Sequence, residues 1–211
     1  IYVPAYDLIP EDARWMWGSK VKIFVQSERM ELYYSYCLKL IEEKKVYVCS
    51  CSQDDFKKSK DEQADCACRN IDVNKQVERW KSMFESSKTA EGDFAVRFKT
   101  NMQDKNPAMR DFPIFRINDT EHPRTGKKYR VWPLMNFSVA IDDHDFGITH
   151  TIRGKDHVDN AKRQQHIYDA FGWKAPFHSY LGRMNFEGIE LSKRKTKAAI
   201  ERGEFDDWDD I

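Results

Sequence analysis

The sequence lacks a net charge, because its 211 residues include 35 Lys and Arg against 35 Asp and Glu. Without a global field, any binding to nucleic acid has to come from local basic patches. No apolar run approaches the roughly 20 residues of a membrane-spanning helix, and no signal-peptide pattern opens the sequence. We therefore expect a cytoplasmic protein that does not contact membranes.

The sequence has five cysteines, which is an odd number. Five cysteines fit a reducing compartment better than a disulfide framework. One of them, Cys37, lies on the apolar face of a helix expected over residues 27–45, with Ser27 as its N-cap. We expect the Cys37 thiol to be a buried, hydrophobic group.

The other four cysteines form two C-x-C pairs, Cys49 with Cys51 and Cys66 with Cys68. Four thiolates can close a tetrahedral zinc site, and the polar segment between the pairs is too polar to fold alone. The C-x-C spacing is tighter than the spacing common at zinc sites, so four incidental thiols remain the alternative. We predict a structural zinc site at these four residues.

Apolar patterns predict the remaining elements. Strands are expected at residues 46–48, 94–99 and 112–118, and helices over 73–86 and from Pro10 onward. A run of acidic residues and histidine at 142–145 suits a metal, but a solvated turn or structural hydrogen bonds are the commoner role of such runs.

The last third of the chain predicts half of a parallel sheet. A β-branched stretch at 148–152 predicts a buried strand, a helix over 160–171 ends at Gly172, and another strand follows at 177–180. This β-α-β order places Arg153 and the basic loop 183–195 at the carboxyl ends of parallel strands. Ligands bind at such ends in open α/β sheets, and the Ser-Lys-Arg-Lys run suits a polyphosphate, although a solvated basic loop is the plainer interpretation.

Several motifs follow one another in a specific order. They are Tyr129-Arg-Val-Trp-Pro-Leu-Met-Asn-Phe, Ile141-Asp-Asp-His, Gly147-Ile-Thr-His, Ile152-Arg-Gly, Gly182-Arg-Met-Asn and Leu191-Ser-Lys-Arg-Lys. In this order they resemble the second half of the catalytic domain of class I glutamyl-tRNA synthetases of the archaeal type. The resemblance covers essentially the whole chain, and the ordered series is more specific than any one motif.

The resemblance implies an α/β fold in which a Rossmann-type parallel sheet is interrupted by an α+β insertion that receives the tRNA acceptor end. Residues 1–47 would then close the first half of the catalytic domain. Residues 48–128 would form the insertion with the cysteine module, and residues 129–188 the second half. Residues 189–211 would hold the signature loop and the start of a helical subdomain.

The implied activity is ATP-dependent ligation of glutamate to its tRNA through a glutamyl-adenylate, with Mg²⁺ accompanying the ATP. Leu191, Ser192 and Lys193 occupy the family's catalytic signature loop, in which Lys193 matches the lysine that stabilises charge on the phosphates. Arg183 and Met184 match residues that bind ATP in glutaminyl relatives. Glu190 stands where the signature has its first lysine.

The resemblance also implies an amino-acid pocket. Arg153 matches an arginine that contacts the substrate glutamate. The guanidinium group of an arginine can donate two parallel hydrogen bonds, which suits a carboxylate better than an amide. His157 falls on a nearby pocket position, and Met135 stands where the family usually has a tyrosine that touches the amino acid. Arg153 favours glutamate over glutamine; a glutaminyl-tRNA synthetase and a non-catalytic RNA-binding or zinc module of the same fold are the alternatives.

The sequence contains no H-x-G-H motif. The resemblance places the family's motif of this kind upstream, together with a substrate-binding arginine and glutamate. We therefore expect the 211 residues alone to bind ATP and glutamate poorly and not to catalyse.

Overall fold

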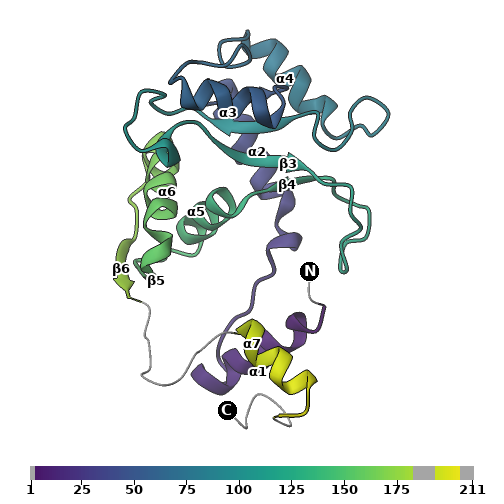
Figure 1. Cartoon of the computed structure of the whole chain (residues 1–211), viewed down its shortest axis with the longest axis vertical. Coiled ribbons are helices and arrows are strands. Elements are labelled where there is room, and N and C mark those ends of the chain that lie inside the picture. Colours follow the sequence, from purple (N-terminus) through teal and green to yellow (C-terminus); the bar gives the residue numbers. More distant parts are fainter. Residues whose placement is uncertain (1–2, 183–192, 205–211) are drawn as a thin grey trace.

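The computed structural model describes residues 3–182 and 193–204, which form a mixed α/β fold with two sheets (Figure 1). The larger sheet is antiparallel, in the order β1 (Val46–Cys49), β2 (Ala95–Phe98), β3 (Phe112–Ile117) and β4 (Val131–Pro133). The smaller sheet pairs β5 (His150–Gly154) in parallel with β6 (Phe177–Leu181). The predicted strands and the parallel β-α-β unit are confirmed.

Helix α2 (Met30–Glu42) supplies one side of the hydrophobic core. The residues predicted for its apolar face are all at most 1% exposed, namely Met30, Tyr33, Cys37, Leu40 and Ile41. The predicted start of this helix was wrong. Ser27 lies in a separate 3₁₀ turn, η1 (Gln26–Glu28), and its hydroxyl is buried without a partner. The side chains of Gln26 and Arg29 both donate hydrogen bonds to the carboxylate of Asp142, and this holds residues 26–29 in the turn. Ser27 therefore lies too far before Met30 to cap α2.

Helix α1 (Ala5–Trp17) begins earlier than predicted, and Pro10 lies inside it rather than at its start. Proline lacks an N–H, so this helix is missing one internal hydrogen bond in its second turn. Only Ala13 of α1 is buried, while Trp15 and Trp17 are 85% and 68% exposed. The described helices include none that is long and apolar enough to cross a membrane.

The segment between the two C-x-C pairs is more ordered than predicted. It contains helix α3 (Gln53–Asp61), which begins after the N-cap Ser52, and only Phe56 of this helix is buried. Phe56 packs in a small cluster with Tyr47 and the cysteines, and Arg110 donates a hydrogen bond to the carbonyl oxygen of Lys60. These two contacts hold an otherwise polar helix against the rest of the protein. Helix α4 (Val73–Ser82) follows, with Trp80 buried in the main core.

Asp72 caps α4, because its carboxylate accepts the backbone N–H of Asn74 at 2.9 Å. We expect Asp72→Ala to destabilise α4 by about 1 kcal/mol, since a first-turn N–H loses its acceptor and the helix dipole loses a nearby anion. Faster amide hydrogen exchange across α4 would report this loss. The matched variant Asp72→Asn keeps a capping oxygen and should exchange nearly as slowly as the unchanged protein; equal acceleration by both variants would contradict a capping role.

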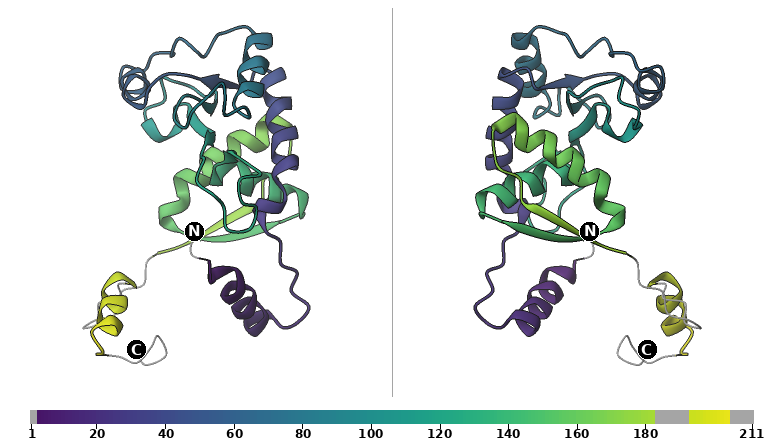
Figure 2. Two further views of the ribbon diagram at one scale, coloured as in Figure 1. Left: turned by 90° about the vertical axis from the view of Figure 1, so that its right-hand side faces the viewer. Right: turned by 90° about the vertical axis from the view of Figure 1, so that its left-hand side faces the viewer.

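Helices α5 (Met135–Asp145) and α6 (Val158–Phe171) pack against each other, and α6 runs from the small sheet towards the short turn η2 (Pro107–Met109) beside the large sheet (Figure 1, Figure 2). As predicted, Gly172 ends α6 in the left-handed conformation, with φ of 69°. The last described helix, α7, spans Lys193–Glu201.

The prediction that the strand at 148–152 is buried was wrong. Ile152 of β5 is 73% exposed, and Phe177 of β6 is 66% exposed. A β-branched run fits a pleated strand whether or not its face is covered, so the pattern identified the strand but not its burial. In the described part of the chain, one face of this two-stranded sheet is open.

One hydrophobic core joins α2, α4, the large sheet, α5 and α6. The predicted domain limit at residue 47 falls inside β1, and β4 pairs with β3 across the limit at residue 128. The domain limits themselves stay a prediction.

Candidate functional site

Arg153 lies at the end of β5 and its side chain is held between α5 and α6. Its Nη1 donates to Oε1 of Gln164 at 2.5 Å, and its Nη2 lies 3.4 Å from Oδ2 of Asp143. Tyr168 also donates to Asp143, at 3.3 Å. Burial raises the pKa of the Asp143 carboxyl, while the neighbouring Arg153 opposes that rise. The guanidinium is therefore fixed in position at the strand end by one carboxylate and one amide oxygen.

The turn after Arg153 is shaped by a glycine. A Cβ on Gly154 would lie 2.4 Å from Oδ1 of Asp156, so any larger residue would force the Asp156 side chain to move. Lys155 follows, and its Cε and Nζ lie 3.9 Å from the position that a Cβ on Gly182 would take. Because Gly182 follows β6, the ends of both parallel strands meet beside a lysine.

His157 and Met135 are linked through two asparagines. Nδ1 of His157 lies 3.0 Å from Nδ2 of Asn160, and the side chain of Asn160 accepts a hydrogen bond from Asn136 at 3.3 Å. Asn136 follows Met135 at the start of α5, and Met135 is 47% exposed. The N-terminal ends of α5 and α6 therefore lie side by side, and two helix N-termini together favour a negatively charged ligand.

The nucleotide side of the predicted site lies largely outside the described residues. This applies to Arg183, Met184, Leu191 and Ser192. Lys193 is the first residue of α7, and its side chain is also outside the description. Their predicted roles stay predictions.

The cysteines of the two C-x-C pairs come together in space. Sγ of Cys49 lies 3.8 Å from Sγ of Cys66, and Sγ of Cys51 lies 3.9 Å from Sγ of Cys68. The sulfurs of Cys49, Cys51 and Cys68 all lie within 4.8 Å of one another. Four sulfurs at 2.3 Å from a zinc ion are about 3.8 Å apart, so these residues fit a tetrahedral metal site. Cys66 is not in this group of three, but its sulfur lies beside that of Cys49.

The thiols of this cysteine cluster influence one another. Hydrogen bonding with Cys49 lowers the pKa of the Cys66 thiol, and the same contact raises the pKa of Cys49. The backbone N–H of Ser50 donates to Sγ of Cys68 at 3.4 Å. Cys37 lies apart, wholly buried in the main core as predicted, and burial raises the pKa of its thiol. No pair among the five cysteines forms a disulfide.

The first two residues of the acidic run at 142–145, Asp142 and Asp143, have structural hydrogen bonds. Asp143 faces Arg153, as described above. Asp142 accepts hydrogen bonds at 2.8–3.0 Å from three side chains near the start of α2, those of Gln26, Arg29 and Tyr33. This interpretation, structural hydrogen bonds rather than a metal, was one of those predicted. Sequence reasoning did not find the partners, since they lie more than a hundred positions away.

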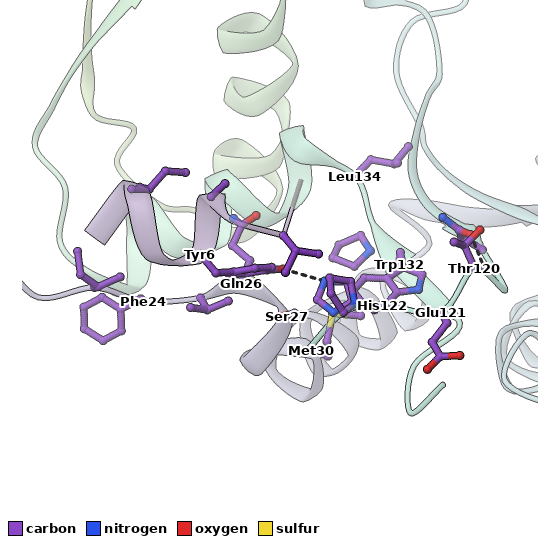
Figure 3. Close-up of a pocket in the computed structure, with 18 of the residues that line it drawn as sticks. Tyr6, Phe24, Gln26, Ser27, Met30, Thr120, Glu121, His122, Trp132 and Leu134 are labelled. Atoms are coloured by element: carbon purple, nitrogen blue, oxygen red, sulfur yellow. Dashed lines mark hydrogen bonds between the residues drawn. The ribbon is translucent and has the colours of Figure 1, made fainter. Parts of the chain in front are cut away.

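A cavity of about 790 Å³ lies between α1, the segment before α2, and the loop between β3 and β4 (Figure 3). The hydroxyl of Tyr6 lies 3.1 Å from Nε2 of His122, whose ring stacks on Trp132 with 4.9 Å between centroids. Burial lowers the pKa of His122. No sequence pattern indicates this cavity, because its lining comes from three distant segments.

A parallel β-α-β unit with an arginine, a lysine and two helix N-termini at its strand ends defines an α/β protein in which this edge suits anionic ligands. The model of the family described as "tRNA synthetases class I (E and Q), catalytic domain" matches residues 4–211. The chain belongs to this family, and its resemblance to the archaeal type is confirmed.

Two curated relatives show the extent of the sequence similarity. The chain is 47% identical over 206 residues to the glutamate–tRNA ligase of Pyrococcus furiosus, covering 97% of this chain and 36% of the relative. It is 47% identical over 208 residues to the glutamate–tRNA ligase of Methanoregula boonei, covering 98% of this chain and 32% of the relative. The chain thus spans about a third of the length of these relatives.

A solved structure shares the fold. The crystal structure of a glutamate tRNA ligase from Elizabethkingia meningosepticum in complex with its amino acid superimposes with a TM-score of 0.58. The sequence identity is 19%, and the match covers 92% of this chain and 43% of that chain.

Proposed function

We propose that this chain is part of an archaeal-type glutamate–tRNA ligase, which joins glutamate to its tRNA at the expense of ATP. The observation that carries the proposal is the identity of 44–47% to archaeal ligases over nearly the whole chain. The glutamate carboxylate attacks the α-phosphate of ATP, pyrophosphate leaves, and the adenylate then passes its acyl group to a hydroxyl at the tRNA 3′ end. No side-chain nucleophile is needed, so the protein contributes positioning and charge stabilisation.

Arg153 is the residue proposed to select glutamate. Its guanidinium is fixed by Gln164 and Asp143, which leaves its remaining donors oriented before the substrate arrives. A substrate carboxylate would accept charge-assisted hydrogen bonds from these remaining donors, whereas an uncharged amide would form weaker ones. His157 and Met135 are proposed to line the same pocket, a view supported by the hydrogen bonds that join their neighbourhoods.

The nucleotide-side roles are carried over from the resemblance. Arg183 and Met184 are proposed to hold ATP, and the loop with Leu191, Ser192 and Lys193 to neutralise its phosphates. Mg²⁺ bound with the ATP would supply further charge neutralisation. In this proposal residues 48–128 receive the tRNA acceptor end, within a Rossmann-type catalytic domain.

Zinc is proposed to hold the cysteine cluster together. Cys49, Cys51, Cys66 and Cys68 would bind it as thiolates, and sulfur separations of 3.8 and 3.9 Å support this set. The role is structural, since four sulfur ligands leave no open position for a substrate. Five free thiols also fit the reducing cytoplasm as the place of action.

The test is amino-acid-dependent ATP–pyrophosphate exchange by the full-length protein with its tRNA present. Exchange with glutamate and not with glutamine is expected. Exchange with glutamine alone would favour a glutaminyl-tRNA synthetase instead. Exchange with neither amino acid would favour a non-catalytic RNA-binding or zinc module.

Arg153→Ala should raise the KM for glutamate by about 10–100-fold, because hydrogen bonds to charged groups contribute about 1.5–3 kcal/mol. The KM for ATP should change little. The exchange assay with varied glutamate measures both constants. The control is Lys162→Ala, which removes an exposed cation from α6 that pairs with Asp159. An unchanged glutamate KM in Arg153→Ala would rule out the proposed contact.

A further inference from the structure

Two arginines lie at the cysteine cluster. Nη1 of Arg79, from α4, lies 3.4 Å from Sγ of Cys68 and 3.2 Å from the carbonyl oxygen of Val48. Arg97, from β2, lies over the ring of Phe56, which packs in the same buried cluster as Cys49. One guanidinium therefore contacts a sulfur of the second C-x-C pair, and the other lies beside the first pair.

Neither arginine has a carboxylate partner among the described residues. Arg97 is only 7% exposed, its guanidinium lies 3.4 Å from the centre of the Phe56 ring, and its Nε is buried without a hydrogen-bond partner. The buried carboxylate of this region, Asp111, is already engaged with Arg69 at 2.9 Å and with the backbone N–H of Thr100 at 2.7 Å. Among residues 3–182 and 193–204, Arg97 therefore has no anionic side chain as a partner.

Further positive charges near Arg97 increase its need for a negatively charged partner. Burial and the positive charges of Arg163, Arg97 and Arg110 together lower the pKa of Lys60. A buried cation without a counter-charge costs several kcal/mol, and four neutral thiols would not offset that cost. Four thiolates around a divalent ion carry a net charge of −2, which two guanidinium groups balance.

We propose that Arg79 and Arg97 are the counter-charges of a divalent metal site formed by the four cysteines. Arg97 acts on Cys49 and Arg79 acts on Cys68, each by donating to a metal-bound sulfur. On metal binding, the four thiols release their protons to solvent and four metal–sulfur bonds form. The arginines lower the negative charge on the bound sulfurs, which disfavours their reprotonation and slows the loss of the metal. The inference rests on the zinc site of the proposed function.

The test compares Arg79→Met and Arg97→Met in the full-length protein, with Arg97→Lys as a variant that keeps the charge. The control is Arg116→Met, which removes an exposed arginine from β3 of the same sheet. Zinc affinity is measured by competition with a chromophoric chelator, and the thiolate-to-cobalt absorption bands are recorded after Co²⁺ replaces zinc. We expect each Met variant to bind zinc about 10–100-fold more weakly and the Lys variant to recover part of the loss.

Unfolding in urea separates this role from ordinary packing. Arg97→Met should destabilise the zinc-loaded protein but not the zinc-free protein, because the zinc-free form gains from losing an unmatched buried charge. Unchanged zinc affinity in both Met variants would overturn the proposal while leaving the zinc site in place. A full-length protein that takes up no zinc would overturn both. The exchange assay with glutamate tests the ligase assignment independently of either outcome.

Discussion

Replacing Asp142 by alanine is expected to destabilise the folded protein by about 3–5 kcal/mol. The carboxylate of Asp142 joins α5 to the start of α2, where it accepts a hydrogen bond from Nε of Arg29 at 3.0 Å and from the hydroxyl of Tyr33 at 2.8 Å. Tyr33 is fully buried, so its hydroxyl has no access to water once this acceptor is gone. Urea unfolding monitored by tryptophan fluorescence measures the loss.

Asp145 provides the matched control, because it also binds Arg29, through Nη2 at 2.5 Å. Its side chain is 41% exposed, against 13% for Asp142. Exposed ion pairs contribute about 0–1 kcal/mol, so Asp145→Ala should have a small effect. Equal destabilisation by the two variants would show that burial of Asp142 does not determine its contribution.

Replacing Lys193 by alanine is expected to slow glutamyl-adenylate formation by about 10²–10³-fold, equivalent to about 3–4 kcal/mol of barrier. The expectation follows from the proposed role of Lys193 in stabilising charge on the phosphates in the transition state. Such an interaction is absent before reaction, so kcat should fall while the KM for glutamate stays nearly constant. Single-turnover formation of the adenylate by the full-length protein measures the rate directly.

Lys197 offers a control on the same helix. It pairs with Glu201 at 3.7 Å on the exposed surface of α7 and has no proposed contact with ATP. Lys197→Ala should leave the rate within about twofold of the unchanged protein, as expected for a surface ion pair. A slow Lys197→Ala enzyme, or a fast Lys193→Ala enzyme, would contradict the assignment of the signature loop.

Elements with strong apolar periodicity could be predicted from sequence. The face of α2 and the β5-α6-β6 unit are examples, because helical spacing and a C-cap glycine are local signals. The start of α2 was predicted wrongly because Asp142, a residue far along the chain, determines the conformation of residues 26–29. Helix α3 was missed because its single buried residue, Phe56, gives no periodic pattern.

In the candidate site too, some features follow from the local sequence and others depend on tertiary packing. The position of Arg153 at a strand end follows from the order of elements, whereas its partners Gln164 and Asp143 depend on how α5 and α6 pack. The cysteine pairs are visible as a spacing motif. The arginines beside them are not, since Arg79 and Arg97 belong to a separate helix and strand with no motif of their own.

The shared core has a consequence for how such proteins diversify by recombination. The outer strands of the large sheet, β1 and β4, lead directly from α2 and into α5, and all four elements bury side chains in the same core. A chimaera with crossovers at residues 47 and 128 would graft a foreign sheet onto buried faces that did not evolve with it. A crossover in the segment before α2, paired with one after α6, would instead inherit the whole core from one parent.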